Sequence, residues 1–244
     1  MNESVCGVTS LAFQIGDCGG LRLEIAGTRA VLRHSGALWL EAERTMVVAD
    51  LHFEKGSSYA ARFGQMLPPY DTRETLDRLE RELAALSPAT LVFLGDSFHD
   101  GAGEDRLPGE DRARIAALAV GRQLVWAVGN HDEDGPRTLP GDVVDEAAIA
   151  GLTFRHEPLP GAQPGEVAGH LHPAAKVTSG RATIRRRCFV TDGARLVLPA
   201  FGAFTGGLNI LDQAFAPLFG GPALAAALGP RRVHAVGWKS LRPD

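Results

Sequence analysis

The chain has few cysteines and no long uninterrupted hydrophobic run. Its 244 residues include three cysteines, Cys6, Cys18 and Cys188, an odd number without the spacing of a disulfide framework or a zinc site. This usage is typical of a reducing compartment, so we expect a cytoplasmic protein. The most apolar stretch of the tail, residues 214–228, is interrupted by prolines and glycines and is shorter than the ~20 apolar residues of a membrane span. No basic segment marks the beginning of the sequence, so we expect neither a secretory signal nor a membrane partner.

An excess of basic residues is missing as well. The formal net charge is −4, from 25 Lys and Arg against 29 Asp and Glu, so any contact with nucleic acid must be made by a local surface. Hydrophobic residues at 45% and charged residues at 22% are typical of a globular protein, and the length allows a sizeable core. The sequence contains no linker and no internal repeat, so we expect residues 1–244 to form a single domain.

The first half of the sequence predicts alternating strands and helices. Short β-rich segments occupy residues 21–25, 29–33, 38–41 and 45–49, and the last is a continuous apolar run, as in a buried central strand. Asp71 can cap a helix that ends before Pro88, with Glu74 as its capping-box partner, and a second helix is predicted at residues 108–120. Strands at residues 90–94 and 123–128 then complete a βαβαβ core with a parallel sheet.

The rest of the sequence is predicted to be rich in β-structure. Strand candidates are residues 151–155, 166–168, 181–190 and 195–198, with residues 233–238 as an edge strand. We therefore expect an α/β fold in which two β-sheets pack face to face and helices lie outside.

Five polar motifs follow apolar runs or glycines. They are Asp50-Leu51-His52, Gly95-Asp96, Gly129-Asn130-His131-Asp132, His156 and Gly169-His170-Leu171-His172. The carboxyl ends of strands are where open α/β sheets bind their ligands. Carboxylate, carboxamide and imidazole groups suit two divalent metals that share a carboxylate, which is an arrangement that hydrolyses phosphate esters.

Single motifs also have simpler interpretations. Gly95-Asp96 is a common turn sequence, and a histidine such as His156 after an apolar segment is often structural. His34 and His234 have no partner motif and are assigned structural roles; His99 is assigned the same role, although it lies near Asp96.

In this order the motifs resemble those of the calcineurin-like metallophosphoesterase superfamily, over about residues 45 to 175. The resemblance implies a four-layer sandwich, with helices flanking the two sheets. It also implies two sets of metal ligands: Asp50, His52 and His172 for the first ion, and Asn130, His156 and His170 for the second. Asp96 would bridge both ions, and the reaction would use a hydroxide that the two metals activate.

The resemblance assigns catalytic roles to two further residues. His131 would act as an acid or stabilise charge on the phosphoryl oxygens, and Asp132 would orient His131 through a hydrogen bond. Mn²⁺ is the expected metal and Fe and Zn²⁺ are the alternatives, because the mixed ligand set suits all three.

Flanking segments resemble one bacterial subgroup, the ligase-associated DNA damage response phosphoesterases (PdeM type). These segments are residues 50–56, 67–72, 94–100 and 198–202. The resemblance implies a phosphodiesterase or nuclease that acts on DNA in repair, in association with a DNA ligase and a helicase. Lys55, Arg62 and His99 are then candidate substrate contacts, although ordinary surface charge explains Lys55 and Arg62 equally well. The run Arg185-Arg186-Arg187 is interpreted as the solvated rim of a strand rather than as a contact with an anionic polymer.

Other functions fit parts of the pattern. A phosphomonoesterase acting on nucleotides or phosphoproteins would use the same two-metal site and is the main alternative. A catalytically idle module that docks on a ligase or helicase would lack a ligand, whereas every motif is present here. Amidohydrolases begin with a His-x-His pair on an early barrel strand, whereas here His170 and His172 come late.

Overall fold

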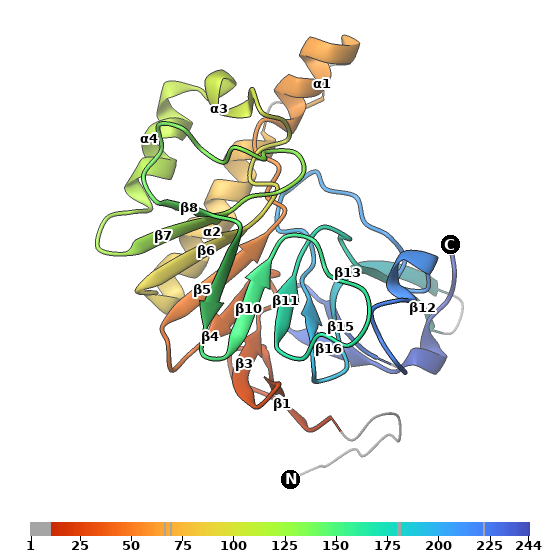
Figure 1. Cartoon of the computed structure of the whole chain (residues 1–244). Coiled ribbons are helices and arrows are strands. Elements are labelled where there is room, and N and C mark those ends of the chain that lie inside the picture. Colours follow the sequence, from red (N-terminus) through yellow and green to blue (C-terminus); the bar gives the residue numbers. More distant parts are fainter. Residues whose placement is uncertain (1–10, 66, 69, 180–181, 222) are drawn as a thin grey trace.

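Two mixed β-sheets of eight strands each form the centre of the computed structural model (Figure 1). The structure describes residues 11–65, 67, 68, 70–179, 182–221 and 223–244. Four positions that entered the sequence predictions lie outside these ranges: Cys6, Pro69, Arg181 and Pro222.

The first sheet follows the chain from one edge to the other. Its strands are β1 (Phe13–Ile15), β2 (Leu21–Ile25), β3 (Thr28–Leu32), β4 (Leu38–Leu40), β5 (Thr45–Ala49), β6 (Thr90–Leu94), β7 (Gln123–Ala127) and β8 (Asp142–Val144). Neighbouring strands are antiparallel from β1 to β5 and parallel from β5 to β8. The predicted parallel βαβαβ core is therefore confirmed, with β5 and β6 at the expected bounds.

Helices α2 (Asp71–Leu86) and α4 (Gly109–Ala117) cover the outer face of this sheet. Helices α1 (Lys55–Phe63) and α3 (Gly103–Arg106) project beyond it (Figure 1). Leu76 and Leu79 of α2 and Ile115 of α4 are fully buried in one cluster with Phe93 and Trp126 of the sheet. The leucines of α2, which recur at three- and four-residue steps, thus form the apolar stripe that fixes this helix to the sheet.

Two details of the helices differ from the sequence prediction. Asp71 is not the cap, because Tyr70 precedes the first turn and the Asp71 carboxylate instead accepts the backbone N–H of Gly56 at 2.9 Å. That N–H lies in the first turn of α1, a helix absent from the sequence prediction, where helical N–H groups lack intrahelical partners. The second helix ends at Ala117 rather than at residue 120, since the next three N–H groups bond to carbonyls three residues back, which tightens the final turn.

The second sheet has the strand order β16-β15-β13-β14-β11-β10-β9, with β12 paired to β13. Its strands are β9 (Glu146–Ile149), β10 (Leu152–Arg155), β11 (Glu166–Ala168), β12 (Ala174–Ser179), β13 (Ala182–Thr191), β14 (Leu196–Val197), β15 (Leu224–Leu228) and β16 (Val233–Val236). The predicted strands are present within a few residues, and β16 is an edge strand as expected. The strands β1, β8, β9, β12 and β15 were absent from the sequence prediction.

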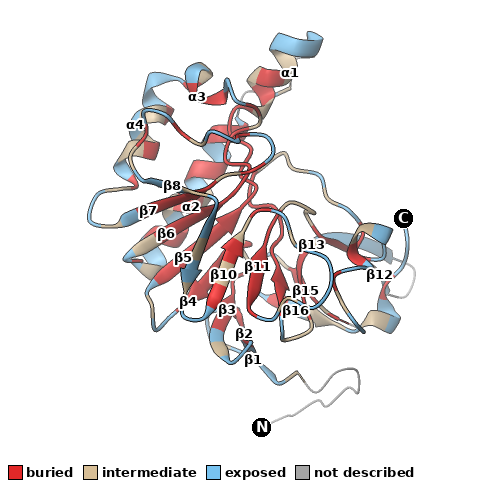
Figure 2. Cartoon of the chain, in the orientation of Figure 1, coloured by how far each residue is buried: buried red, intermediate tan, exposed pale blue. Residues whose placement is uncertain are grey.

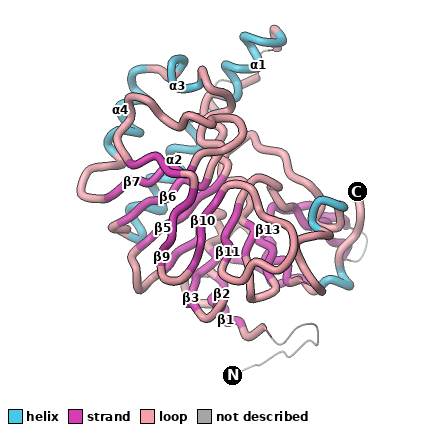
Figure 3. Tube along the Cα trace, in the orientation of Figure 1, coloured by secondary structure: helices cyan, strands magenta, loops and turns pink. Residues whose placement is uncertain are grey.

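Apolar side chains from both sheets form one buried cluster. Figure 2 colours much of the strands of both sheets as buried. Val47 and Val92 of the first sheet belong to the same cluster as Phe154 and Phe189 of the second. On the outer face of the second sheet, loops and two 3₁₀ helices, η1 (Gln213–Phe215) and η2 (Trp238–Ser240), take the place of long helices (Figure 3). The expected α/β sandwich of two packed sheets is confirmed. Every helix in the described ranges is too short or too polar to cross a lipid bilayer.

Candidate metal centre

Five strand ends bring the predicted ligands together. Asp50 follows β5, Asp96 follows β6, Asn130 follows β7, His156 follows β10 and His170 follows β11. The two sheets are joined at this edge, because the backbone N–H of His170 lies 3.1 and 3.0 Å from the two carboxylate oxygens of Asp50. Ligands from the two halves of the chain therefore share one site.

The first group of ligands contains Asp50, His52, Asp96 and His172. The Nε2 atom of His172 lies 3.2 Å from Asp50 Oδ1 and 3.2 Å from His52 Nε2. His52 Nε2 is 3.8 Å from Asp96 Oδ2. One donor atom of each residue lies within 4.8 Å of the others, so the four can surround a single ion.

The second group centres on His156. Its Nε2 atom lies 3.0 Å from Asn130 Oδ1, 3.1 Å from His170 Nδ1 and 3.4 Å from Asp96 Oδ1. Asp96 thus directs one carboxylate oxygen toward each group, and it is the residue that both groups contain. This is the arrangement that a bridging ligand between two ions requires.

Backbone carbonyls orient two of the histidine rings. His156 Nδ1 lies 3.3 Å from the carbonyl oxygen of Leu94, a contact in which Nδ1–H donates and the Nε2 lone pair is left for a metal. His131 Nδ1 lies 2.9 Å from the carbonyl oxygen of His99, and its Nε2 atom is 3.9 Å from Asp96 Oδ2. The His131 ring therefore presents Nε2 at the rim of the site.

The electrostatics of the site suit divalent cations. Burial, followed by the nearby His172, lowers the pKa of His52 to about 2, and burial lowers the pKa of His170, so both rings are neutral and can ligate. Burial raises the pKa of Asp96, so a nearby positive charge would favour its ionised form. Nitrogen and oxygen donors without a thiolate fit Mn²⁺, Fe or Zn²⁺.

Five of the predicted ligands have a strained backbone. The φ angles are 54° for Asp50, 48° for His52, 45° for Asp96, 66° for His170 and 46° for His172, all in the left-handed region. Such conformations cost non-glycine residues about 1–3 kcal/mol each and cluster at functional sites. The motif sequences did not reveal this strain.

Two glycines of the motifs leave room for the ligands. Gly95 has φ 73°, and a Cβ atom there would lie 2.1 Å from His156 Nδ1. A Cβ atom on Gly129 would lie 2.2 Å from the backbone nitrogen of Asp96 and 2.3 Å from its Oδ1. Neither contact is tolerable, so the glycines before Asp96 and Asn130 permit the close approach of the loops.

Asp132 is used differently from the sequence expectation. Its Oδ2 atom accepts the backbone N–H groups of Ser97 at 2.8 Å and Phe98 at 3.1 Å, and Oδ1 accepts that of Gly129 at 3.1 Å. The carboxylate therefore holds the loop after β6 against the loop after β7. His131 is oriented by the His99 carbonyl instead, because Asp132 is turned toward these N–H groups, which would otherwise be buried without partners.

Two of the three candidate substrate contacts gather beside His131. The His99 ring stacks on the His131 ring, with 5.3 Å between centroids, and burial followed by the charge of Lys55 lowers the pKa of His99 to about 4. Lys55 Nζ lies 5.9 Å from the centroid of Tyr59, which in turn lies 5.6 Å from the His99 ring. The sequence analysis did not identify Tyr59 as part of this cluster. The only sequence feature that points to it is its spacing of four residues from Lys55, which places both on one face of a helix.

Arg62 lies farther along α1 and is directed to a different partner. Its Nη2 atom is 3.7 Å from Asp100 Oδ2, and its side chain is 60% exposed. Its charge acts on His99, but it is not part of the cluster around His131.

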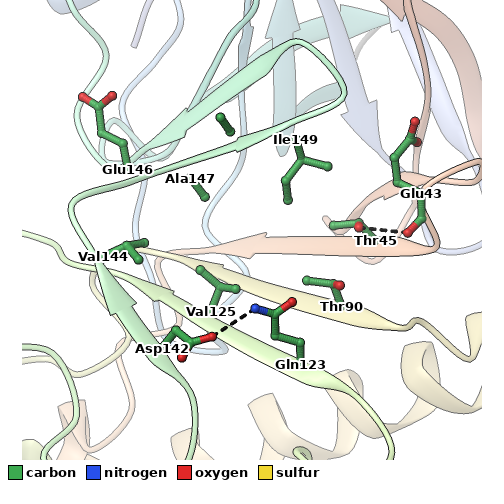
Figure 4. Close-up of a pocket in the computed structure, with 11 residues that line it drawn as sticks. Glu43, Thr45, Thr90, Gln123, Val125, Asp142, Val144, Glu146, Ala147 and Ile149 are labelled. Atoms are coloured by element: carbon green, nitrogen blue, oxygen red, sulfur yellow. Dashed lines mark hydrogen bonds between the residues drawn. The ribbon is translucent and has the colours of Figure 1, made fainter.

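A hollow at the opposite edge of the first sheet holds none of the predicted ligands (Figure 4). It measures about 560 Å³, and its lining includes Thr45, Thr90 and Gln123, the first residues of β5, β6 and β7. Because the ligands follow the other ends of the same strands, this hollow is separate from the candidate metal centre.

Known proteins resemble this chain in sequence and structure. The model of the calcineurin-like phosphoesterase family matches residues 43–194. Among solved structures, the crystal structure of Pseudomonas putida nuclease MPE matches this chain with a TM-score of 0.65 and 31% sequence identity. The match covers 92% of this chain and 100% of that one. Yfce, a phosphoesterase from E. coli, is 15% identical with a TM-score of 0.40, over 79% of this chain and 98% of that one. No sequence among the curated proteins matches significantly. Since the family model covers more than half of the chain, this protein belongs to the calcineurin-like phosphoesterase family and is a hydrolase acting on phosphate esters.

Proposed function

We propose that the protein is a metal-dependent phosphodiesterase that cleaves DNA. The observation that carries the proposal is the position of Asp96, whose two carboxylate oxygens face two separate groups of ligands. The 31% identity to a nuclease over the whole length of that protein supports a phosphodiester of nucleic acid as the substrate.

The two groups would hold two divalent ions, with Mn²⁺ as the first choice. The first ion would be held by Asp50, His52 and His172, the second by Asn130, His156 and His170, and Asp96 would be shared. When bound, such a pair lowers the pKa of water and stabilises the charge of the attacked phosphate.

His131 is proposed as the catalytic acid. Its ring is 41% exposed, so Nε2 can reach a substrate, while the His99 carbonyl holds Nδ1. A protonated His131 would donate from Nε2 to the leaving oxygen or to a phosphoryl oxygen. Asp132 would act as a positioning residue for the loops that carry Asp96 and Asn130, rather than as a catalytic group.

Lys55, Arg62 and His99 are proposed to meet the substrate around this centre. The Lys55 ammonium lies beside His99 and Tyr59, so it can neutralise a phosphate bound next to His131. Arg62 would contact a more distant phosphate, because its side chain is exposed and lies outside the cluster around His131. The flanking segments that resemble the ligase-associated subgroup support a role in cytoplasmic DNA repair together with a ligase and a helicase.

The test compares substrates and variants of the purified protein. With Mn²⁺, we expect hydrolysis of bis(p-nitrophenyl) phosphate and of DNA, and little hydrolysis of p-nitrophenyl phosphate. Asp96→Asn should abolish turnover and reduce the bound metal, because Asp96 belongs to both ligand groups. His131→Ala should reduce turnover while the metal content stays at the wild-type level.

Glu110→Gln is the control, since this carboxylate is 74% exposed on α4. A clear preference for monoesters over diesters and DNA would contradict the proposal and favour a phosphomonoesterase. Full activity of Asp96→Asn would contradict the assigned centre.

A further inference from the structure

A groove lined by arginines lies next to the candidate metal centre. It measures about 610 Å³ and is formed by α2, β13, the turn between β3 and β4 and the turn between β15 and β16. Its basic residues include Arg78, Arg81, Arg185, Arg186 and Arg187. In a chain with a net charge of −4, this is a local concentration of positive charge.

Acidic residues neutralise only part of this charge. Glu82, the carboxylate in the groove lining, is paired with the buried Arg33 at 2.8 Å. Arg78 lies 3.4 Å from Glu74, and Arg185 lies 3.3 Å from Asp244.

Three guanidinium groups of the groove have no carboxylate partner among the described residues. Throughout the part of the chain that the structure describes, no carboxylate lies within 4.0 Å of Arg81, Arg186 or Arg187. Their charges are therefore available to an anionic partner.

Arg187 remains charged although a second guanidinium group, that of Arg78, lies nearby. Burial, followed by the nearby Arg78, lowers the pKa of Arg187 to about 10, which still leaves the guanidinium protonated at neutral pH. Its Nη1 atom donates to the carbonyl oxygens of Ala200 at 2.8 Å and Gly202 at 2.9 Å. A bound anion would relieve the repulsion between the two arginines.

A single loop separates the groove from the metal centre. On the groove side, Arg187 binds the carbonyls of Ala200 and Gly202, and Arg78 Nη1 binds that of Phe201 at 2.6 Å. On the other side, the N–H of Gly202 donates to the backbone oxygen of Asp50 at 3.1 Å. The two sites are therefore adjacent along the same edge of the molecule.

We propose that the groove binds the sugar–phosphate backbone of the nucleic acid whose scissile bond lies at the metal centre. The inference rests on the proposed function and extends it, since it assigns substrate affinity to residues outside the centre. Guanidinium groups recognise phosphates through paired hydrogen bonds, and contacts to the backbone position a strand without reading its sequence. The groove would thus supply affinity that does not depend on base sequence.

The test removes two exposed arginines that have no role in the centre. In Arg81→Ala/Arg186→Ala, we expect the KM for DNA to rise while kcat for DNA and the kinetics on bis(p-nitrophenyl) phosphate stay unchanged. Binding of a labelled oligonucleotide, measured by fluorescence anisotropy in EDTA, should weaken. The slope of log Kd against log salt should fall by about 1.4–1.8, since two phosphate contacts are lost. The matched control is Arg22→Ala/Arg29→Ala, which removes two exposed arginines of the β2–β3 hairpin.

The outcomes separate the groove from the proposed function. If the wild type cleaves DNA and the groove variant keeps the wild-type KM and salt slope, the groove proposal is wrong and the nuclease function stands. If the variant binds DNA normally but loses binding of polyglutamate, the groove serves an acidic protein instead. If the wild type hydrolyses small esters but neither binds nor cleaves nucleic acid, both proposals are wrong.

Discussion

Glu104 ties the segment that follows His131 to helix α3, so its replacement tests how the site is supported. The side chain is buried, with 4% exposure. Its Oε2 atom accepts the backbone N–H of Arg137 at 2.6 Å, and Oε1 accepts the N–H of Thr138 at 2.9 Å and the Thr138 hydroxyl at 2.5 Å. The perturbation is Glu104→Gln, which keeps the size of the side chain and removes one acceptor.

The magnitude follows from the lost acceptor. The glutamine amide can keep its oxygen toward Thr138, and the NH₂ group then faces the N–H of Arg137 without accepting it. A hydrogen bond to a charged group contributes about 1.5–3 kcal/mol, and the bonds to Thr138 become roughly half as strong when the acceptor is neutral. We expect the free energy of unfolding to fall by about 2–4 kcal/mol. Glu110→Gln is the control and should change it by less than about 1 kcal/mol, because that ion pair is exposed.

The effect should depend on pH with a definite sign. Burial alone would raise the pKa of Glu104, but the hydrogen bonds from Arg137 and Thr138 hold it below its ordinary value of 4.5. A folded-state pKa below the unfolded one contributes stability that is present above pH 4.5 and is lost as the pH falls through the folded value. Urea unfolding should therefore show a difference between wild type and Glu104→Gln that is full at pH 7 and shrinks in acid. A difference below about 0.5 kcal/mol at pH 7, or one that is constant with pH, would refute the reasoning.

Three further predictions concern the centre and the thiols. Gly95→Ala should displace the His156 ring, because the new Cβ would lie 2.1 Å from Nδ1; metal analysis should then show fewer ions per chain than in the wild type. Chelation of bound metal should lower Tm and added Mn²⁺ should restore it, since ions that bind the folded state at a hundredfold excess over Kd contribute about 2.7 kcal/mol; an unchanged Tm would contradict the centre. In a Cys6→Ser background, a thiol reagent should label Cys18, which is exposed, and not Cys188, because burial raises the pKa of that thiol; labelling of both in the folded protein would contradict the buried position.

The central strands could be predicted from the sequence because local pattern and tertiary position agree there. β5 and β6 are continuous apolar segments between polar turns, and both are almost wholly buried. Strand β15 shows the opposite case. Its sequence, Leu-Ala-Ala-Ala-Leu, has high helix propensity, yet it pairs with β13 and β16. The hydrogen bonds to two neighbouring strands override the helix propensity, and a local sequence pattern carries no information about these strands.

Helix α1 could not be predicted for a similar reason. It contains Gly56, Ser57 and Ser58 near its start, which are weak helix formers. Its first turn is held from outside, by the Asp71 carboxylate at Gly56 N–H and by Asp100 at the Ser58 hydroxyl. Because Tyr59 lies on this helix, its position beside His99 could not be predicted from the sequence either.

The predicted ligands of the centre could be grouped from the sequence because each lies within a few residues of the end of a strand, and those strand ends meet at one edge of the structure. Asp132 was accessible only in part. The family resemblance suggested His131 as its partner, whereas the structure turns its carboxylate to Ser97 and Phe98. The choice of partner depends on how closely the loops after β6 and β7 approach each other. Gly129 permits this approach because it has no side chain to contact Asp96, a residue that is distant in the sequence.

The position of the charged groups in the arginine groove also depends on the fold. Arg81 of α2 and Arg186 of β13 are about a hundred positions apart in the sequence. From the sequence around either residue alone, a binding surface looks the same as an ordinary solvent-exposed strand or helix. The fold places them on one groove, one loop away from Asp50. Under the two proposals, the centre would determine turnover of any diester, whereas the groove would act only on substrates long enough to reach it. The ratio of kcat/KM for DNA to that for a small diester would therefore isolate the contribution of the groove, even though the net charge of the chain is negative.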